Sequence, residues 1–198
     1  MSAESMSAES LSAESLATES LSTGIVPVAD RLEGLPADLP ARVLGKAELR
    51  ALADALAERP ELWRRHVRFS DERRHYASLY RDEYVDVWLL CWTPENDTGW
   101  HDHDVSSGAV RVVSGALEEC NPRIGGAHVR TVVPEGTSFC FGPDHIHRLV
   151  GAAPASVSIH AYSPPLWRLG QYTIAEDGLM RRASVSYADE LRPLDRPA

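Results

Sequence analysis

From residue 75 onward, short apolar runs of strand length alternate with polar turns. Residues 85–92 read VDVWLLCW and residues 156–162 read SVSIHAY, and both runs are rich in the β-branched and aromatic residues that strands favour. Many short strands separated by turns are typical of a sandwich or barrel. We therefore predict a mainly β domain. Its expected strands are residues 75–80, 85–92, 100–103, 108–113, 116–120, 128–133, 138–141, 147–150 and 156–162, with a possible hairpin of 171–175 and 180–184.

A helical pattern precedes the strands. In residues 47–59, apolar side chains recur at the spacing of one helix face, and Pro60 marks the end of that helix. This stripe consists of Leu49, Leu52, Ala53 and Leu56. A second, shorter helix is predicted for residues 61–66.

The first twenty residues repeat a five-residue unit, which reads MSAES, MSAES, LSAES and LATES. A period of five matches neither a helix face nor a strand face, and Ser, Ala and Glu bury too little apolar area to offset the entropy of ordering. We predict a disordered repeat tail and linker over residues 1–40, a single domain over residues 41–185 and a C-terminal extension over residues 186–198.

Composition narrows the class of protein. The chain of 198 residues suits one domain with appendages, and its formal net charge of −9 argues against nucleic-acid binding, which favours clustered Lys and Arg. Cys91, Cys120 and Cys140 are odd in number, which indicates a reducing compartment. No apolar run is long enough to span a membrane, and the N-terminus does not resemble a signal peptide. We predict a cytoplasmic monomer that binds neither nucleic acid nor membrane, with an oligomer left open.

Two histidines lie two residues apart on a predicted strand. His101 and His103, in the sequence GWHDHD, point to the same face because side chains alternate along a strand. A neutral imidazole from another strand, His147 in PDHIHR, would complete a metal site of three histidines. Such a set describes catalytic zinc as well as iron, so these residues alone leave the metal open. His145 shares the parity of His147 and is assigned to the rim of the site.

The spacing of these residues resembles the paired motifs of the cupin fold. The first motif reads Gly-x-His-x-His, with Gly108 five residues after His103, and the second ends at His147. The resemblance implies a single cupin barrel, which is a double-stranded β-helix or jelly roll, with short N-terminal helices. Many cupins carry a glutamate ligand where this chain has Gly108. The implied ligand set is therefore His101, His103 and His147 without a carboxylate.

Four blocks of sequence together resemble cysteine dioxygenase of the thiol dioxygenase family. They are WLLCW at 88–92, HDHD at 101–104, IHR at 146–148 and SIHAYSPP at 158–165. The resemblance covers roughly residues 45–185. It implies Fe(II) held by three histidines, a small thiol and O2 as substrates, and a sulfinic acid that receives both oxygen atoms. Cysteine is the implied thiol, and 3-mercaptopropionate or another small thiol carboxylate stays open.

The resemblance also implies roles for individual residues. The family's Ser-x-His-x-Tyr triad corresponds to Ser158, His160 and Tyr162, in which Tyr162 assists dioxygen or substrate positioning and the other two orient it. Animal members crosslink this tyrosine to a cysteine at the position of Gly108, so Tyr162 is predicted to be unmodified. The alignment does not fix the arginine that grips the substrate carboxylate. The candidates are Arg74, Arg81 and Arg168.

Other functions fit the same residues. A different metallocupin, such as a zinc or manganese isomerase or hydrolase, would use the same three histidines. A non-catalytic cupin that binds a small ligand is a further possibility. Separately, His160 could be a core histidine that is hydrogen-bonded to its neighbours, and Tyr162 a packed aromatic residue.

Aromatic and acidic neighbours of the motifs are given structural roles. Trp88, Trp92 and Trp100 are predicted to fill the barrel core rather than to form a substrate platform. Asp102 and Asp104 alternate with the histidines and are predicted to face away from the metal.

Overall fold

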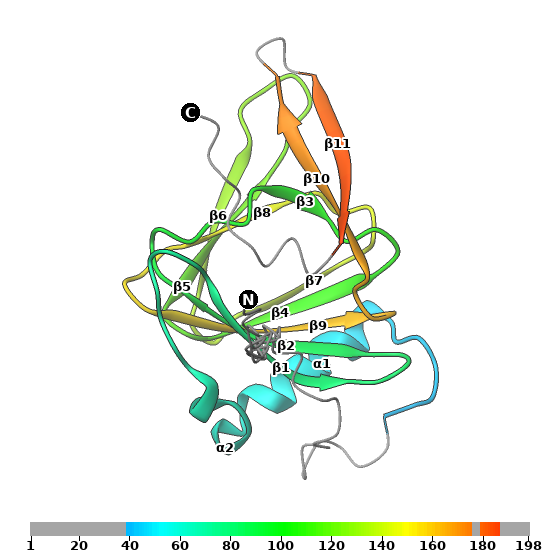
Figure 1. Cartoon of the computed structure of the whole chain (residues 1–198), viewed down its shortest axis with the longest axis vertical. Coiled ribbons are helices and arrows are strands. Elements are labelled where there is room, and N and C mark those ends of the chain that lie inside the picture. Colours follow the sequence, from blue (N-terminus) through cyan, green and yellow to red (C-terminus); the bar gives the residue numbers. More distant parts are fainter. Residues whose placement is uncertain (1–38, 176–178, 187–198) are drawn as a thin grey trace, which may run out of the picture.

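The computed structural model describes residues 39–175 and 179–186, which form two layers of antiparallel strands with helices on the outer side of one layer (Figure 1). The predicted tail and linker lie outside the described residues except for residues 39 and 40, and the predicted extension lies outside them except for Ser186. Among the described residues, no helix combines the length and the hydropathy that crossing a membrane requires.

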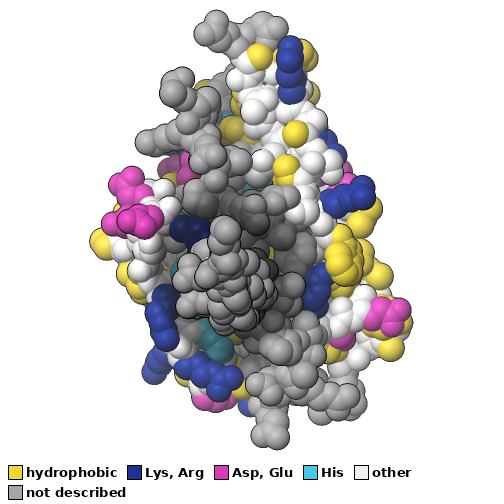
Figure 2. Space-filling model, viewed as in Figure 1, with side chains coloured by type: hydrophobic (Ala, Val, Ile, Leu, Met, Phe, Trp, Pro, Cys, Tyr) yellow, Lys and Arg dark blue, Asp and Glu magenta, His cyan; other side chains and the backbone are white. Residues whose placement is uncertain are grey.

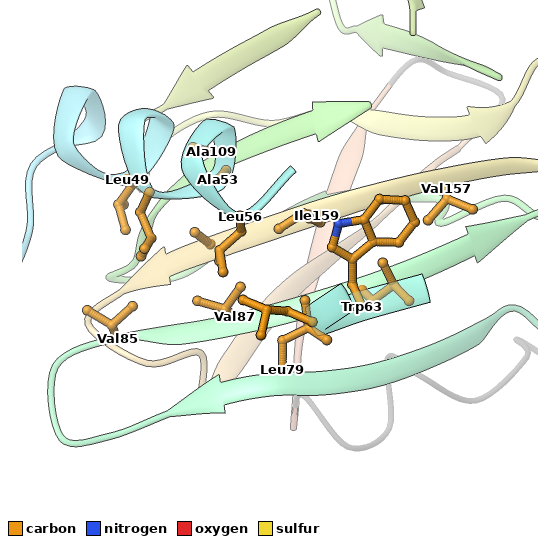
Figure 3. Close-up of a cluster of buried hydrophobic side chains, with 14 of the residues drawn as sticks. Leu49, Ala53, Leu56, Trp63, Leu79, Val85, Val87, Ala109, Val157 and Ile159 are labelled. Atoms are coloured by element: carbon orange, nitrogen blue, oxygen red, sulfur yellow. The ribbon is translucent and has the colours of Figure 1, made fainter. Parts of the chain in front are cut away.

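Helix α1 (Lys46–Ala57) covers the outer face of the larger sheet (Figure 3). The helix begins after Gly45, whose backbone N–H donates to the Glu48 carboxylate at 2.9 Å and so satisfies a backbone group at the helix start. The predicted apolar stripe is buried against the sheet, because its side chains share one face of the helix. This confirms the first predicted helix.

Two short segments continue from α1. They are α2 (Pro60–Trp63) and the 3-10 helix η1 (Arg64–His66). Pro60 is tolerated at the first helical position because that position needs no N–H donor. Together the two segments confirm the second predicted helix. Trp63 packs into the same buried cluster as α1 (Figure 3).

The larger sheet has the strand order β1-β2-β9-β4-β7, and all neighbouring strands are antiparallel. Its strands are β1 (His75–Arg81), β2 (Asp86–Trp92), β4 (Ser107–Ser114), β7 (Ser138–Phe141) and β9 (Ser156–Ser163). Strand β9 is buried over its whole length, because both of its faces are covered. Val157 and Ile159 face the helices (Figure 3), and the alternate positions face the space between the layers.

The opposite layer consists of two three-stranded sheets, with the orders β11-β10-β3 and β6-β5-β8. Their strands are β3 (Trp100–Asp102), β5 (Ala116–Asn121), β6 (Val129–Pro134), β8 (Arg148–Gly151), β10 (Arg168–Ile174) and β11 (Met180–Ser186). The two sheets meet where His101 pairs with His147 and where Asp97 pairs with Val150. The mainly β, double-stranded β-helix fold is confirmed, and each of the nine predicted strands is present with its ends shifted by no more than one residue.

Charged side chains of both signs are visible on the face shown in Figure 2. One ion pair bears on the arrangement of the sheets: Arg148 Nε donates to Asp97 Oδ1 at 2.9 Å, next to the backbone pair of Asp97 with Val150. Because Arg148 directly follows His147, this contact ties the segment that leads into β3 to the start of β8.

Candidate active site

The three predicted metal ligands converge between the two layers. His101 and His147 form a backbone pair in which each N–H donates to the other's carbonyl oxygen, at 2.9 and 3.0 Å, so their side chains leave on the same face. His103 lies on that face because it is two residues from His101. The ring centroids are 4.7 to 5.2 Å apart, and one nitrogen of each ring lies within 4.8 Å of the other two. The structure therefore brings the three residues together.

Burial keeps these rings in the form that binds a metal. Burial lowers the pKa of His147 to about 3 and lowers the pKa of His103 well below its usual range. A neutral imidazole has one protonated nitrogen and one bare nitrogen, and the bare nitrogen is the metal ligand. Both histidines therefore carry a ligand nitrogen at neutral pH.

Hydrogen bonds determine which nitrogens face the centre. His147 Nδ1 lies 2.9 Å from Glu119 Oε1, and His101 Nδ1 lies 3.1 Å from the Gly99 carbonyl oxygen, so each Nδ1 carries the proton and each Nε2 is bare. In the described part of the chain, His147 Nε2 and His103 Nδ1 are buried without a hydrogen-bond partner. Buried polar atoms of this kind are rare, and a metal ion would satisfy them. The residues present therefore fit a metal ion.

Glu119 lies behind His147, on the side away from the centre. Burial raises the pKa of this carboxyl, but hydrogen bonds from His145 and His147 outweigh burial and bring the pKa to about 2. Glu119 is therefore ionised at neutral pH and accepts from both rings, at 3.0 Å from His145 Nε2 and 2.9 Å from His147 Nδ1. Side-chain exposure is 31% for His145, which was assigned to the rim.

Asp102, which lies between His101 and His103, points to the opposite side of the strand. Its carboxylate accepts hydrogen bonds from Arg182 Nε at 2.7 Å, from the Tyr172 hydroxyl at 2.6 Å and from the Gly170 N–H at 3.0 Å. Burial raises the pKa of Asp102, but the hydrogen bonds from Arg182 and Tyr172 lower it further than burial raises it. The β10–β11 hairpin thus holds the strand that carries His101 in place.

A cavity lies beside the three histidines. Its wall includes Arg74, Trp88, Trp92, His101, His160 and Tyr162. Leucine side chains provide much of the remaining lining. A mostly apolar wall with a few polar groups is typical of a site for a small molecule. Because His101 is part of the wall, a molecule in the cavity would lie next to the candidate metal centre.

Ser158, His160 and Tyr162 form a hydrogen-bonded row along β9, on the face that the alternation of the strand predicts. Ser158 Oγ lies 2.8 Å from His160 Nε2, and His160 Nδ1 lies 3.1 Å from Tyr162 Oη. Burial lowers the pKa of His160 well below its usual range, so this ring is neutral. Trp92 extends the row, because its Nε1–H donates to Ser158 Oγ at 2.8 Å.

Trp92 fixes one hydrogen bond of the row. An indole nitrogen only donates, so Ser158 Oγ accepts from Trp92. A hydroxyl oxygen has two lone pairs, so His160 Nε2 either receives the Ser158 proton or donates to Ser158, and the tautomer of His160 decides the direction of the row. In the tautomer with its proton on Nδ1, His160 donates to Tyr162 Oη, and the Tyr162 hydroxyl keeps its own proton for a molecule in the cavity that it lines. The row can present a proton donor to a bound molecule.

Gly108 faces Tyr162 across the β4–β9 pair. A Cβ at this position would lie 2.4 Å from two ring carbons of Phe141 and 3.1 Å from Tyr162 Cδ1. A glutamate or a cysteine here would have to displace the Phe141 ring, which stacks on His103 with a centroid distance of 4.6 Å. The glycine thus makes room for the ring that packs on a candidate ligand.

Of the three arginines predicted to hold a carboxylate, Arg74 lines the cavity. Its guanidinium carbon lies 4.7 Å from the centroid of the Trp92 ring. Arg81 instead pairs with the buried Asp86, and Arg168 is exposed at the start of β10. Neither Arg81 nor Arg168 lines the cavity as formed by the described residues. The geometry favours Arg74 among the three.

Sequence reasoning missed two features of the site. Trp88 and Trp92 were predicted to fill the core, and this is corrected in part: Trp92 is fully buried, but both indoles also line the cavity. Glu119 was given no role, although its parity could have revealed it. It lies two residues from the buried Leu117 in a predicted strand and so shares the inward face.

The chain matches the model of a known protein family and is similar to several solved structures. The sequence model of a family described as cysteine dioxygenase type I matches residues 37–174. The chain is similar to an uncharacterized conserved protein with a double-stranded beta-helix domain from Klebsiella pneumoniae, at 15% identity and a TM-score of 0.46, over 61% of this chain and 92% of that one. It is also similar to an rmlc-like cupin protein from Desulfovibrio desulfuricans, at 18% identity and a TM-score of 0.43, over 50% of this chain and 90% of that one.

Proposed function

The chain belongs to the cysteine dioxygenase type I family, and from this premise we propose that it is an Fe(II)-dependent dioxygenase that oxidises a small thiol carboxylate to a sulfinic acid. The observation that carries the proposal is the convergence of His101, His103 and His147 beside a cavity that Tyr162 also lines. In the reaction, R–SH and O2 give R–SO2H. Both oxygen atoms end on the sulfur, and dioxygen takes up the electrons that the sulfur loses, so no further reductant is needed.

His101, His103 and His147 would hold the iron through imidazole nitrogens, which suit Fe(II). When bound, Fe(II) would supply a charged centre with open coordination positions that favours the thiolate form of the substrate and brings it together with dioxygen. Because neutral imidazoles carry no charge, the three ligands would leave the positive charge of the iron in place to attract the thiolate.

Tyr162 would position the reactants through its hydroxyl group. For this role we assign His160 the tautomer with its proton on Nδ1, so that His160 would donate to Tyr162 Oη and Tyr162 would use its own proton to hydrogen-bond a group in the cavity. Ser158 and Trp92 fix the orientation of His160 from the other end of the row. The side chains of this row are buried in the strand layer, which would limit their rearrangement when a substrate binds.

Arg74 would bind the substrate carboxylate. A guanidinium group offers paired N–H donors that match a carboxylate, and the Trp92 ring beneath Arg74 supports its plane. This contact would select thiols that carry a carboxylate, which includes both cysteine and 3-mercaptopropionate.

Oxygen consumption by the iron-loaded protein tests the proposal. We expect uptake with cysteine or 3-mercaptopropionate, a product that is heavier than the thiol by two oxygen atoms, and far slower uptake with cysteamine, which lacks the carboxylate. In Arg74→Leu, the rate of oxygen uptake with thiols that carry a carboxylate should fall toward the rate with thiols that lack one. Stoichiometric zinc in the purified protein together with no uptake on any thiol would instead favour a zinc metallocupin.

Replacing Tyr162 with phenylalanine should leave iron binding unchanged and lower turnover. The substitution removes one hydrogen-bond donor from the cavity, and loss of such a donor lowers kcat on the order of 100-fold. Tyr80→Phe is the matched control, because the Tyr80 hydroxyl donates to Asp82 at 2.7 Å outside the cavity. Turnover and iron content are measured for both variants. Full turnover in Tyr162→Phe would remove Tyr162 from the mechanism.

A further inference from the structure

We propose that Glu119 is a positioning residue for the metal, which fixes the ring of His147 from behind so that Nε2 faces the centre. The inference rests on the proposed function, because it requires that His101, His103 and His147 bind the metal. It adds a residue that belongs to neither histidine motif and lies on a different strand, β5.

The contact between Glu119 and His147 is buried. Glu119 Oε1 lies 2.9 Å from His147 Nδ1, and the two side chains are 11% and 1% exposed. An ionised carboxylate only accepts hydrogen bonds, so His147 must carry its proton on Nδ1. The opposite nitrogen, Nε2, is then bare, and it is the buried atom of His147 that has no partner among the described residues. The contact therefore decides both the tautomer and the orientation of this ligand.

Glu119 is itself held by a second ring. His145 Nε2 lies 3.0 Å from the same oxygen, Oε1, so the carboxylate is fixed between two donors. An acceptor that is fixed in advance does not need to reorient when the metal binds. A negatively charged acceptor also makes the imidazole a stronger electron donor to a metal on its other nitrogen.

Glu119, His145 and His147 also bring ligand atoms within 4.8 Å of one another, so they must be weighed as a cation site of their own. The hydrogen bonds argue against this. Both rings already donate to Glu119 Oε1, so the two nitrogens that face Glu119, His145 Nε2 and His147 Nδ1, are satisfied without an ion. On the other side of His147, Nε2 has no partner in the described part of the chain. The metal is thus expected on the Nε2 side, with Glu119 outside its ligand set.

Metal affinity of variants at Glu119 tests the inference. The full-length protein is stripped of metal and titrated with Fe(II) without oxygen, and with Co(II), whose absorption bands report the ligand geometry. Glu119→Leu should weaken Fe(II) binding roughly 10- to 100-fold, as is typical when a hydrogen-bond partner of a metal ligand is removed. Glu119→Gln keeps the shape and an acceptor oxygen but loses the charge, so its affinity should fall by a smaller factor and its Co(II) bands should shift.

Glu118→Gln is the matched control. Glu118 is the neighbour on β5, points to the opposite face and pairs with Arg130 at 3.3 Å, so its loss should leave the affinity unchanged. Urea unfolding of the metal-free variants separates this role from a purely structural one, which would lower the stability of Glu119→Gln without changing its affinity or its Co(II) spectrum. If Glu119→Leu does not fold, Glu119→Gln decides the question.

Each outcome has a distinct meaning. Wild-type affinity in both Glu119 variants would overturn this inference alone and leave the proposed function intact. A wild-type protein that binds neither Fe(II) nor Co(II) would overturn both. His145→Gln should weaken binding less than Glu119→Leu does, and metal loss in it as complete as in His101→Ala would overturn the inference by making His145 a ligand.

Discussion

Replacing His147 with alanine should remove the metal and the activity together. His147 is fully buried, and its Nε2 is the proposed ligand atom on the side of β8, whereas His101 and His103 both come from the segment around β3. In the variant, only His101 and His103 remain, and both would hold the ion from the same segment of the chain. We therefore expect the iron content of the purified variant to fall to background and oxygen uptake with thiols to fall with it.

The experiment needs a control for the loss of a histidine as such. His128 is exposed and meets the edge of the Trp100 ring, so His128→Ala should keep both iron and activity. Metal analysis and oxygen uptake are measured on the same preparations, and the circular dichroism of the metal-free proteins checks that the variant is folded. Wild-type iron content in a folded His147→Ala protein would refute the assignment of this ligand.

Acid should destabilise the metal-free protein steeply below neutral pH. Burial lowers the pKa of His103, His147 and His160, so the folded protein keeps these rings neutral at a pH at which the unfolded chain protonates them. The folded pKa lies below the unfolded value of about 6.5. The contribution of these three rings to the free energy of unfolding is therefore fully present above about pH 6.5 and is lost as the pH falls below that value.

The expected slope is large because three groups act together. A single proton taken up on unfolding changes the free energy of unfolding by about 1.4 kcal/mol per pH unit, so three give up to about 4 kcal/mol per unit. Asp86 acts in the opposite sense: burial raises the pKa of this carboxyl to about 6, against the effect of Arg81, so it favours the folded state as the pH falls from about 6 to 4. Between about pH 6 and pH 4, Asp86 therefore cancels the contribution of about one of the three imidazoles to the slope.

Urea unfolding of the metal-free protein at several pH values between 7 and 5 measures this slope. His160→Gln should reduce the slope by about one proton, because it removes one of the buried imidazoles. A free energy of unfolding that is the same at pH 7 and pH 5 would show that the three rings are not kept neutral in the folded protein.

Strand alternation explains why much of the site was predictable. His101 and His103 share a face because they are two residues apart, and the same rule places Ser158, His160 and Tyr162 in one row. This rule is local and needs no knowledge of neighbouring strands. The apolar stripe of α1 and the nine strands could be predicted for the same reason, since each depends on a period within its own segment.

Two features of the site depended on strands that are distant in sequence. His145 and His147 have the same parity, and only the backbone pair of His147 with His101 selects the ligand. Glu119 reaches His147 because β5 lies beside β8. Local periods cannot supply such information, because the register between strands is set by the packing of the whole sheet.

The sequence by itself determined that this is a mainly β protein of the double-stranded β-helix type and which side chains share a strand face. The tertiary structure alone decided that Arg74 rather than Arg81 or Arg168 lines the cavity, that Trp92 donates to Ser158 at one end of the Ser158-His160-Tyr162 row, and that Glu119 lies against His147. The reason is physical. The direction of a side chain follows from the local backbone, but its partners follow from strand order and register, which form only when the layers pack.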